Sequence, residues 1–161
     1  MLKILKTIAI IVFVVAPVAL ILTGQSGLLS GTRPTDLGLK DGMLKPPVKD
    51  YFNVVSSYAG KQPHTAYHVI APINYTGSGQ EAFNKLEAIV RGMDGATIIT
   101  RQDNYLYAEF QSKVLKFVDD VEFVLDEPAG VIQMRSASRL GRKDLNVNRK
   151  RLEAVRAKFG A

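Results

Sequence analysis

The chain begins with an apolar segment that decides one part of its architecture. No charged residue occurs between Lys6 and Arg33, and the stretch after Lys6 reads TIAIIVFVVAPVALIL. With the apolar residues before it, about 20 residues are available, and a helix of that length spans about 30 Å of hydrocarbon. Pro17 is compatible with this, because proline can kink a membrane helix without excluding it. The sequence therefore predicts a membrane anchor over residues 1–24, in contact with the bilayer through residues 4–22.

Two other interpretations of this segment are weaker. A cleaved signal peptide has an apolar core of about 7–15 residues followed by a small-x-small cleavage site. Here the apolar core is longer, and Gly24-Gln25-Ser26 is the best cleavage site available. A buried helix of a soluble domain is the second alternative, and an apolar surface all round the helix from the N-terminus onward argues against it. We expect the anchor to remain uncleaved.

The charges around the anchor predict its orientation. Lys3, Lys6 and the terminal amine precede the apolar run, whereas Arg33 is the only basic residue in the next 15 or so positions. Positive charge is retained on the cytoplasmic side of a membrane. The N-terminus is therefore expected in the cytoplasm and the C-terminal domain outside it. In a Gram-negative bacterium this is a single-pass inner-membrane protein with a periplasmic domain.

Cysteine and histidine usage excludes several kinds of site. The chain has no cysteine, so disulfides, thiolate metal ligands, a cysteine nucleophile and a lipidated N-terminal cysteine are all absent. His64 and His68 are four residues apart, but their proline-flanked segment is expected to be extended, which would place them about 13 Å apart. We predict neither a metal site nor a cofactor.

The remainder divides into a linker over residues 25–50, rich in glycine and proline, and a soluble α+β domain over residues 51–161. The domain is expected to have the order β-α-β-β-β-β-α, an antiparallel sheet of about five strands with its helices packed on one face. Expected strands are Thr65–Ile70, Ala96–Arg101, Tyr105–Ser112, Val118–Asp126 and Val131–Ser138. Expected helices run from the capping box at Ser78 and Glu81 to Gly92, and from Asp144 to Phe159, with Leu145, Leu152, Val155 and Phe159 as the apolar stripe of the second.

Matching the apolar faces of the last three strands predicts their register. Leu125 should oppose Ile132, which leaves a four-residue loop and places Glu122 opposite Arg135. Glu109 should then oppose Asp120 or Glu122. Facing carboxylates destabilise a sheet unless a cation lies between or beside them, and Arg135 is the candidate cation within the chain.

The same alternation places these charged residues on the open face of the sheet. They can form a salt-bridge ladder on a solvated surface, where each exposed pair contributes about 0–1 kcal/mol, or they can form a surface for a ligand or partner. The candidate binding residues, from this face and from the start of the last helix, are Tyr105, Tyr107, Glu109, Asp119, Asp120, Glu122, Arg135, Ser136, Ser138, Arg139, Asp144, Asn148 and Arg149.

Several of these segments occur in an order that resembles one known family. They are Tyr105–Ser112 (YLYAEFQS), Phe117–Phe123 (FVDDVEF), Arg135–Arg139 (RSASR), and Asp144 with Asn148–Arg151 (NRKR), together with the region around Asn53 and Ser56-Ser57. Over about residues 51–158 the chain is similar to the uncharacterised bacterial and plastid family known as domain of unknown function 1499. The resemblance implies no established reaction.

The chain departs from the pattern of that family at two positions. Val54 stands where the family often has cysteine, so any thiol role is absent here. Asn146 stands where the family usually has glycine, and asparagine tolerates a positive φ better than most residues, so the same turn can form.

Positive charge is concentrated at the C-terminus. The formal net charge of +6 divides into +2 for residues 1–44, −3 for residues 45–134 and +7 for residues 135–161, which sum to +6. Phosphate groups bind arginine and the free amides of helix N-termini. The tail has a single aromatic residue, Phe159, and an exported domain meets little nucleic acid, so we exclude a nucleic-acid partner. Anionic lipid headgroups remain a candidate, beside a solvated helix face of no specific role.

The leading interpretation is a membrane-tethered, non-enzymatic binding or scaffolding domain. Its partners would be the inner membrane itself, another envelope protein or an anionic lipid. A lipid or small-molecule carrier, with a cavity between the sheet and the C-terminal helix, is one alternative. A metal-dependent hydrolase that uses Glu109, Asp120 and Glu122 is the other.

Overall fold

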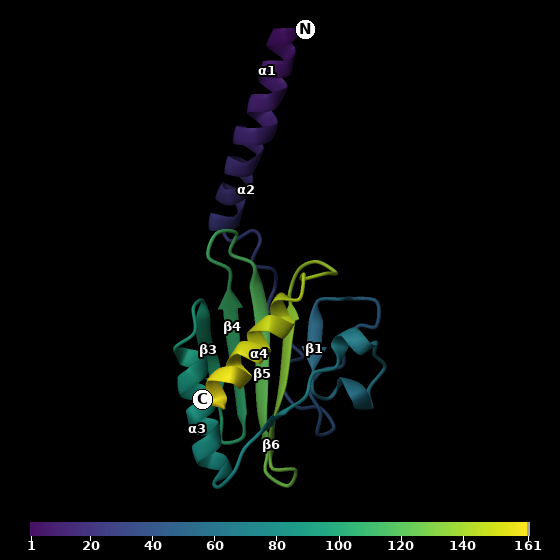
Figure 1. The fold of residues 1–161 in the computed structure, drawn as a ribbon, viewed down its shortest axis with the longest axis vertical. Helices are drawn as coiled ribbons and strands as arrows, with labels where there is room; N and C mark the ends of the chain where they lie inside the picture. The colour runs from purple at the N-terminus through teal and green to yellow at the C-terminus, as the bar shows by residue number, and fades with distance from the viewer. Residues whose placement is uncertain (161) are drawn as a thin grey trace.

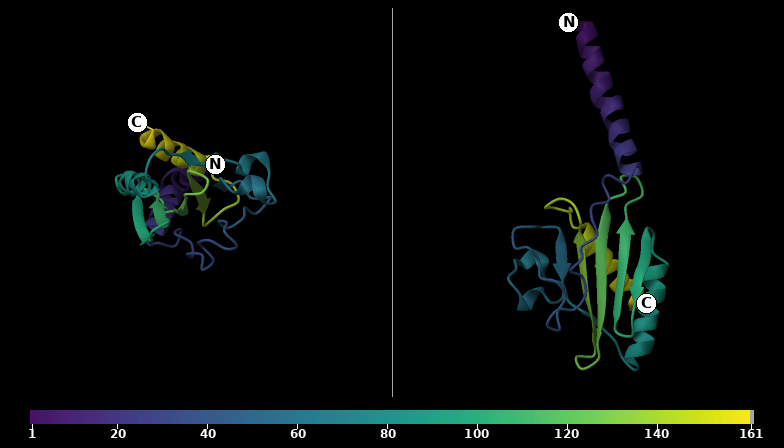
Figure 2. Two further views of the ribbon diagram at one scale, coloured as in Figure 1. Left: turned by 90° about the horizontal axis from the view of Figure 1, so that it is seen from below. Right: turned by 180° about the vertical axis from the view of Figure 1, so that it is seen from behind.

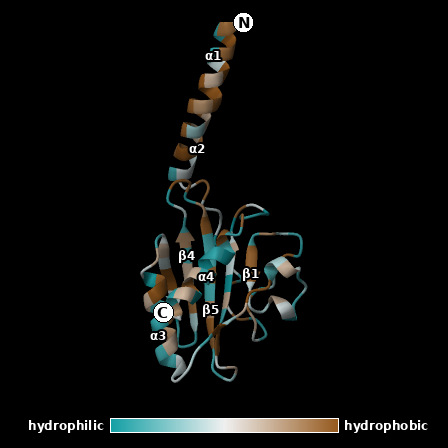
Figure 3. Cartoon of the chain, in the orientation of Figure 1, coloured by the Kyte–Doolittle hydropathy of each residue, from teal (hydrophilic) through white to brown (hydrophobic). Residues whose placement is uncertain are grey.

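The N-terminal segment is one continuous helix that projects from the domain in the computed structural model, which describes residues 1–160 (Figure 1). It comprises α1 (Leu2–Ile10), a π-helical turn η1 (Ile11–Val15) and α2 (Ala16–Gln25). The π turn ends two residues before Pro17, whose missing N–H and bulky ring exclude the usual hydrogen bond there. The side chains of the whole N-terminal helix are largely exposed, and most of its residues are apolar (Figure 3). The helix is long and apolar enough to cross a membrane, a property that signal sequences share.

The domain is an antiparallel sheet with two helices on one face (Figures 1 and 2). The strands are β1 (Val54–Ser56), β2 (Ile73–Asn74), β3 (Ala96–Arg101), β4 (Tyr105–Gln111), β5 (Val118–Asp126) and β6 (Val131–Ser138). Their spatial order is β1-β6-β5-β4-β3, and β2 also pairs with β6. The covering helices are α3 (Gly79–Arg91) and α4 (Val147–Phe159). The predicted α+β class is confirmed, with six strands in place of about five.

The expected strand over residues 65–70 is wrong. Residues Ala66–His68 form a short 3-10 helix, η3, because the His68 ring accepts a hydrogen bond from the Thr65 amide at 2.9 Å and closes the turn locally. His68 is fully buried, and its other ring nitrogen lies 2.8 Å from the Tyr51 carbonyl oxygen. The edge strand is supplied instead by β1, which pairs with β6; a second 3-10 turn, η2 (Ala59–Lys61), follows it.

Both predicted helices of the domain are present, and the second begins later than expected. Ser78 caps α3, its hydroxyl accepting from the Glu81 amide at 3.4 Å, and Gly92 ends that helix. Helix α4 begins three residues later than expected, at Val147, because Leu145 and Asn146 adopt positive φ angles of 54° and 66°. This turn directs Leu145 outward, where it is 85% exposed, so the predicted apolar stripe loses its first member.

The main core fills the space between the sheet and its two helices. Fully buried side chains from α3, α4 and the central strands pack together there, among them Phe83, Leu86, Phe123, Met134 and Leu152. Each contributes about 1.5–3 kcal/mol through burial of apolar surface. The sheet and the C-terminal helix are thus in direct contact through a packed core.

The other face of the sheet is covered by the segment that follows the N-terminal helix. Residues 33–45, here called the strap, cross that face, as the view from behind shows (Figure 2). Leu44 of the strap is fully buried in a second apolar cluster with Tyr58, Tyr105, Tyr107 and Val124. The face that the sequence analysis expected to be open is therefore covered, because a segment without apolar periodicity still supplies a well-placed apolar side chain.

Candidate functional site

The predicted register of the central hairpins is confirmed. Leu125 pairs with Ile132 and Glu122 with Arg135, while Glu109 pairs with Asp120 on the adjacent strand. Alternation with a period of two places these charged residues and the two tyrosines of β4 on the strap side of the sheet. The predicted charged side chains and tyrosines therefore share one face of the sheet.

Arg139 is the cation that lies between the facing carboxylates. Its Nε and Nη2 donate to Asp120 at 3.1 and 2.7 Å, and Nη2 also donates to Glu109. The Tyr107 hydroxyl lies 2.6 Å from Asp120 Oδ1 and 3.0 Å from Glu109 Oε1. Arg33 of the strap reaches Glu109 from the other side at 2.6 Å. The prediction that Arg135 fills this place is wrong, because the next basic residue on the same face lies nearer to the Glu109–Asp120 pair.

Arg135 instead forms a second group with Glu122. Its Nη1 donates to Glu122 Oε2 at 2.9 Å, and the Tyr105 hydroxyl donates to Oε1 at 2.9 Å. The strap completes this group, since the Gly38 amide donates to Glu122 Oε1 at 2.7 Å and the Lys45 carbonyl accepts from Arg135 Nε at 3.0 Å. Glu122 is fully buried and Arg135 is 5% exposed.

Burial and hydrogen bonding shift the pKa values of these groups. Burial opposes ionisation of Glu109, but hydrogen bonds from Arg33, Arg139 and Tyr107 outweigh it and hold the pKa of this carboxyl below its usual range. Burial and the neighbouring carboxylates raise the pKa values of the Tyr105 and Tyr107 hydroxyls, which therefore remain protonated donors. The Glu109 carboxylate is thus kept charged and the two phenols neutral.

This face is a buried polar layer rather than a solvated ladder of exposed pairs. Glu109, Asp120 and Glu122 all have arginine and tyrosine partners, and the strap lies over them. A buried ion pair costs desolvation energy that good geometry and added hydrogen bonds must offset. While the strap is in place, the three carboxylates are engaged within the chain, and this geometry gives little support to hydrolysis by them.

The remaining predicted residues lie on the helix side of the sheet and organise the start of α4. Asn148 is fully buried; its side chain donates to the Asn53 carbonyl at 3.0 Å and to Ser138 Oγ at 2.9 Å, and accepts from Ser136 Oγ at 2.5 Å. Arg149 donates to the carbonyl oxygens of the η3 segment. These contacts join the first and last parts of the domain.

Asp144 lies just before the N-terminus of α4 and bonds the backbone there. Its carboxylate accepts from the Asn146 and Asn148 amides at 3.0 and 2.9 Å and from the Tyr67 hydroxyl. Burial opposes its ionisation, but these hydrogen bonds outweigh the burial and lower the pKa of the carboxyl. Two of the amides at this helix end, those of Asn146 and Asn148, are therefore already paired with a carboxylate of the chain itself.

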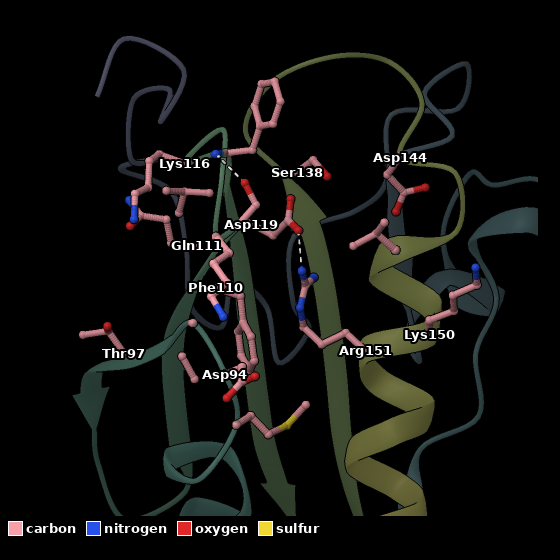
Figure 4. A pocket seen from close by; sticks show the side chains of 18 of the residues that line it. Asp94, Thr97, Phe110, Gln111, Lys116, Asp119, Ser138, Asp144, Lys150 and Arg151 are labelled. Atoms are coloured by element: carbon pink, nitrogen blue, oxygen red, sulfur yellow. Dashed lines mark hydrogen bonds and ion pairs between the residues drawn. The ribbon is translucent and has the colours of Figure 1, made fainter. Parts of the chain in front are cut away.

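An open cleft of about 1370 Å³ lies beside α4, where the helix leaves the upper part of β4 and β5 uncovered (Figure 4). On the side of β5, Arg151 reaches from α4 to Asp119 at 2.5 Å and lies over the Phe110 ring, 4.8 Å from its centroid. Of the predicted residues, Asp119, Ser138 and Asp144 line this cleft. The lining of the cleft therefore combines apolar side chains, such as Phe110, with polar and charged ones.

Lysine residues dominate the charge of this cleft, which is called the lysine cleft below. Its basic lining residues are Lys113, Lys116, Lys143, Lys150, Arg151 and Lys158, against Asp94, Asp119 and Asp144. Arg151 is paired with Asp119, and Asp144 caps α4. Among residues 1–160 none of the five lysines has an ion-pair partner. Sequence reasoning missed these lysines as a group, although the excess of +7 in the C-terminal segment was a signal for three of them.

Residues 1–160 contain no cluster of three or more histidine, cysteine, aspartate or glutamate side chains that could hold a metal ion. His64 is exposed and bonds locally to the Gln62 carbonyl, and the buried His68 is held by backbone groups. The two histidines thus have structural contacts of their own.

Residues 45–159 match the model of a family described as "Protein of unknown function (DUF1499)". No curated protein and no solved structure matches the chain. The matched range contains the sheet, α3, α4 and the lysine cleft, whereas the N-terminal helix and nearly all of the strap lie outside it.

Proposed function

The chain belongs to the DUF1499 family, whose description names no activity, and from its own geometry we propose that it is a membrane-tethered, non-enzymatic binding domain. Its binding site is the lysine cleft, and its ligand is an anionic molecule that bears a phosphate group. The charged strap face has a supporting role, because its carboxylates and arginines neutralise each other beneath the strap.

The observation that carries this proposal is the concentration around one concave site of lysines that have no ion-pair partner among residues 1–160. Five lysines from the β4–β5 loop, the β6–α4 loop and α4 line the cleft. Flexible ammonium groups suit a mobile phosphate, because each contributes a point charge with rotatable donors. Near an anionic surface each lysine adds about 1 kcal/mol. The packed core between sheet and helices makes an open cleft a better ligand site than an enclosed carrier cavity.

Charge reversal in the cleft tests the proposal. Glycerol phosphate, titrated onto the full chain in nanodiscs of phosphatidylcholine, is expected to shift amide resonances of the two loops. The triple variant Lys113→Glu, Lys116→Glu, Lys143→Glu should weaken this binding at least tenfold. The matched control Lys40→Glu, Lys49→Glu, Lys61→Glu changes the net charge equally at exposed positions outside the cleft. If both triple variants weaken binding equally, net charge alone is responsible and the cleft is not the site.

We also propose that residues 4–22 anchor the chain in the inner membrane. The N-terminus would then lie in the cytoplasm and the domain in the periplasm. The length and hydropathy of the helix support a membrane span, and the lysines before it support the orientation. Contacts between the end of α2 and the domain support an anchor that stays attached.

The absence of cysteine allows a direct test of this topology. A single Lys61→Cys substitution, at an exposed domain position, should react with a membrane-impermeant maleimide in intact Gram-negative cells. The matched Lys3→Cys variant should react only after the inner membrane is permeabilised. The reverse pattern would contradict the orientation, and release of a shortened Lys61→Cys chain into the periplasm would show cleavage of the anchor.

A further inference from the structure

The end of the membrane helix is docked on one loop of the domain. The Gln25 side chain donates to the Val114 carbonyl at 2.8 Å, and the Ser30 hydroxyl donates to the Lys116 carbonyl at 3.2 Å. Gly24 is buried against Leu115 so closely that a Cβ on Gly24 would lie 2.7 Å from the Leu115 carbonyl oxygen. The β4–β5 loop, residues 112–117, therefore has a defined position at the foot of the anchor.

This docking places the loop in the headgroup layer. If residues 4–22 span the hydrocarbon, Gly24 lies about 3 Å beyond its boundary, since a helix rises about 1.5 Å per residue. The headgroup layer on each side of a bilayer is about 5–8 Å thick. The Leu115 segment of the loop, which contacts Gly24, then lies within that layer. The β6–α4 loop, residues 139–146, lies at the same end of the sheet (Figures 1 and 2).

The composition of the two loops suits that layer. Val114, Phe117, Leu140 and Leu145 are exposed by 53, 39, 40 and 85%. Lysines stand beside them at positions 113, 116 and 143. Exposed apolar side chains interleaved with lysine are typical of segments that lie in a membrane interface, where the apolar parts enter the acyl boundary and the ammonium groups meet phosphates.

The same two loops form the membrane-side margin of the lysine cleft. Lys116, Phe117, Leu140 and Lys143 all line it. Below them the cleft continues over apolar side chains that include Met93 and Phe110. A ligand with one phosphate and one apolar part can thus enter from the bilayer without crossing open water.

We propose that the cleft takes its ligand from the bilayer in which the chain is anchored, and that this ligand is an anionic phospholipid. The inference rests on the proposed function and adds the source of the phosphate. The lysines of the two loops hold the headgroup phosphate, and Phe117 and Leu140 contact the glycerol and upper acyl region. The docked anchor keeps the mouth of the cleft at headgroup depth.

The absence of tryptophan provides the reporter for a test. In a Phe117→Trp variant of the full chain, reconstituted in phosphatidylcholine vesicles, the single indole is at the cleft mouth. Bromine on the acyl chains of a small fraction of the lipid quenches an indole in contact with it. Brominated phosphatidylglycerol should quench at a mole fraction at least fivefold lower than brominated phosphatidylcholine. Adding Lys113→Glu, Lys116→Glu and Lys143→Glu should abolish this preference, while Lys40→Glu, Lys49→Glu and Lys61→Glu should preserve it.

The outcomes separate this inference from the proposed function. Equal quenching by the two brominated lipids, together with binding of glycerol phosphate in the same vesicles, would overturn the lipid source and leave an anion-binding cleft. Equal quenching without glycerol phosphate binding would overturn both. No quenching by either lipid would contradict the position of the loop in the membrane interface, and with it the inference.

Discussion

Replacing Arg139 by alanine is expected to lower the free energy of unfolding by about 3–5 kcal/mol, because removal of one partner leaves buried charges uncompensated. Asp120 is 2% exposed and would lose all its ion-pair contacts, while Glu109 would retain only Arg33. Urea unfolding of the full chain in detergent, at neutral pH, measures the change. Arg91→Ala is the matched control, because Arg91 forms an exposed pair with Glu87 on α3 and should cost about 0–1 kcal/mol.

The pH dependence of this effect gives a second check. The folded-state pKa of Glu109 is lowered, so its stabilising contribution is present above the unfolded value of about 4.3 and is lost as pH falls through the folded value. Without Arg139, Glu109 loses one of the hydrogen bonds that lower its pKa, so this carboxyl takes up a proton at a higher pH than in the native chain. The stability difference between the native chain and Arg139→Ala should therefore be constant near neutral pH and shrink as pH falls below about 4, toward the folded pKa of Glu109. A difference independent of pH would show that Arg139 acts through packing.

Replacing Leu44 by alanine is expected to lower the free energy of unfolding by about 2–4 kcal/mol, the range for truncating a buried leucine. Leu44 is fully buried against Tyr105, Tyr107 and Val124, although it precedes the range matched by the family model. The strap is thereby held on the sheet. Its loosening should accelerate hydrogen exchange at the Gly38 amide, which donates to Glu122.

Leu39→Ala is the matched control for the strap, because Leu39 lies on the same segment and is 42% exposed. Its effect on unfolding should stay within about 0.5 kcal/mol. If Leu44→Ala behaves like Leu39→Ala in both measurements, the strap is a flexible linker and the charged face beneath it is free to bind a partner, as the sequence analysis first suggested.

Local patterns were sufficient for the parts of the fold that depend on near neighbours. The alternation in β4, β5 and β6 has a period of two, and short loops connect these strands, so only one register buries Phe123 and Leu125. The cap at Ser78 and the positive φ at Asn146 are also local properties. The error at residues 65–70 arose where a side-chain contact within one turn, from His68 to Thr65, outweighed β-propensity.

The N-terminal helix is the part that the sequence by itself determined, since length and apolarity are sufficient to predict a helix long enough to cross a membrane. The same holds for the hairpin pairs that place Glu122 opposite Arg135. Tertiary structure alone decided that the strap covers this face, that Arg139 joins Glu109 to Asp120, and that lysines from two loops and a helix surround one cleft. These contacts join residues separated by tens of positions, and they depend on where the chain crosses the sheet, which no periodicity encodes.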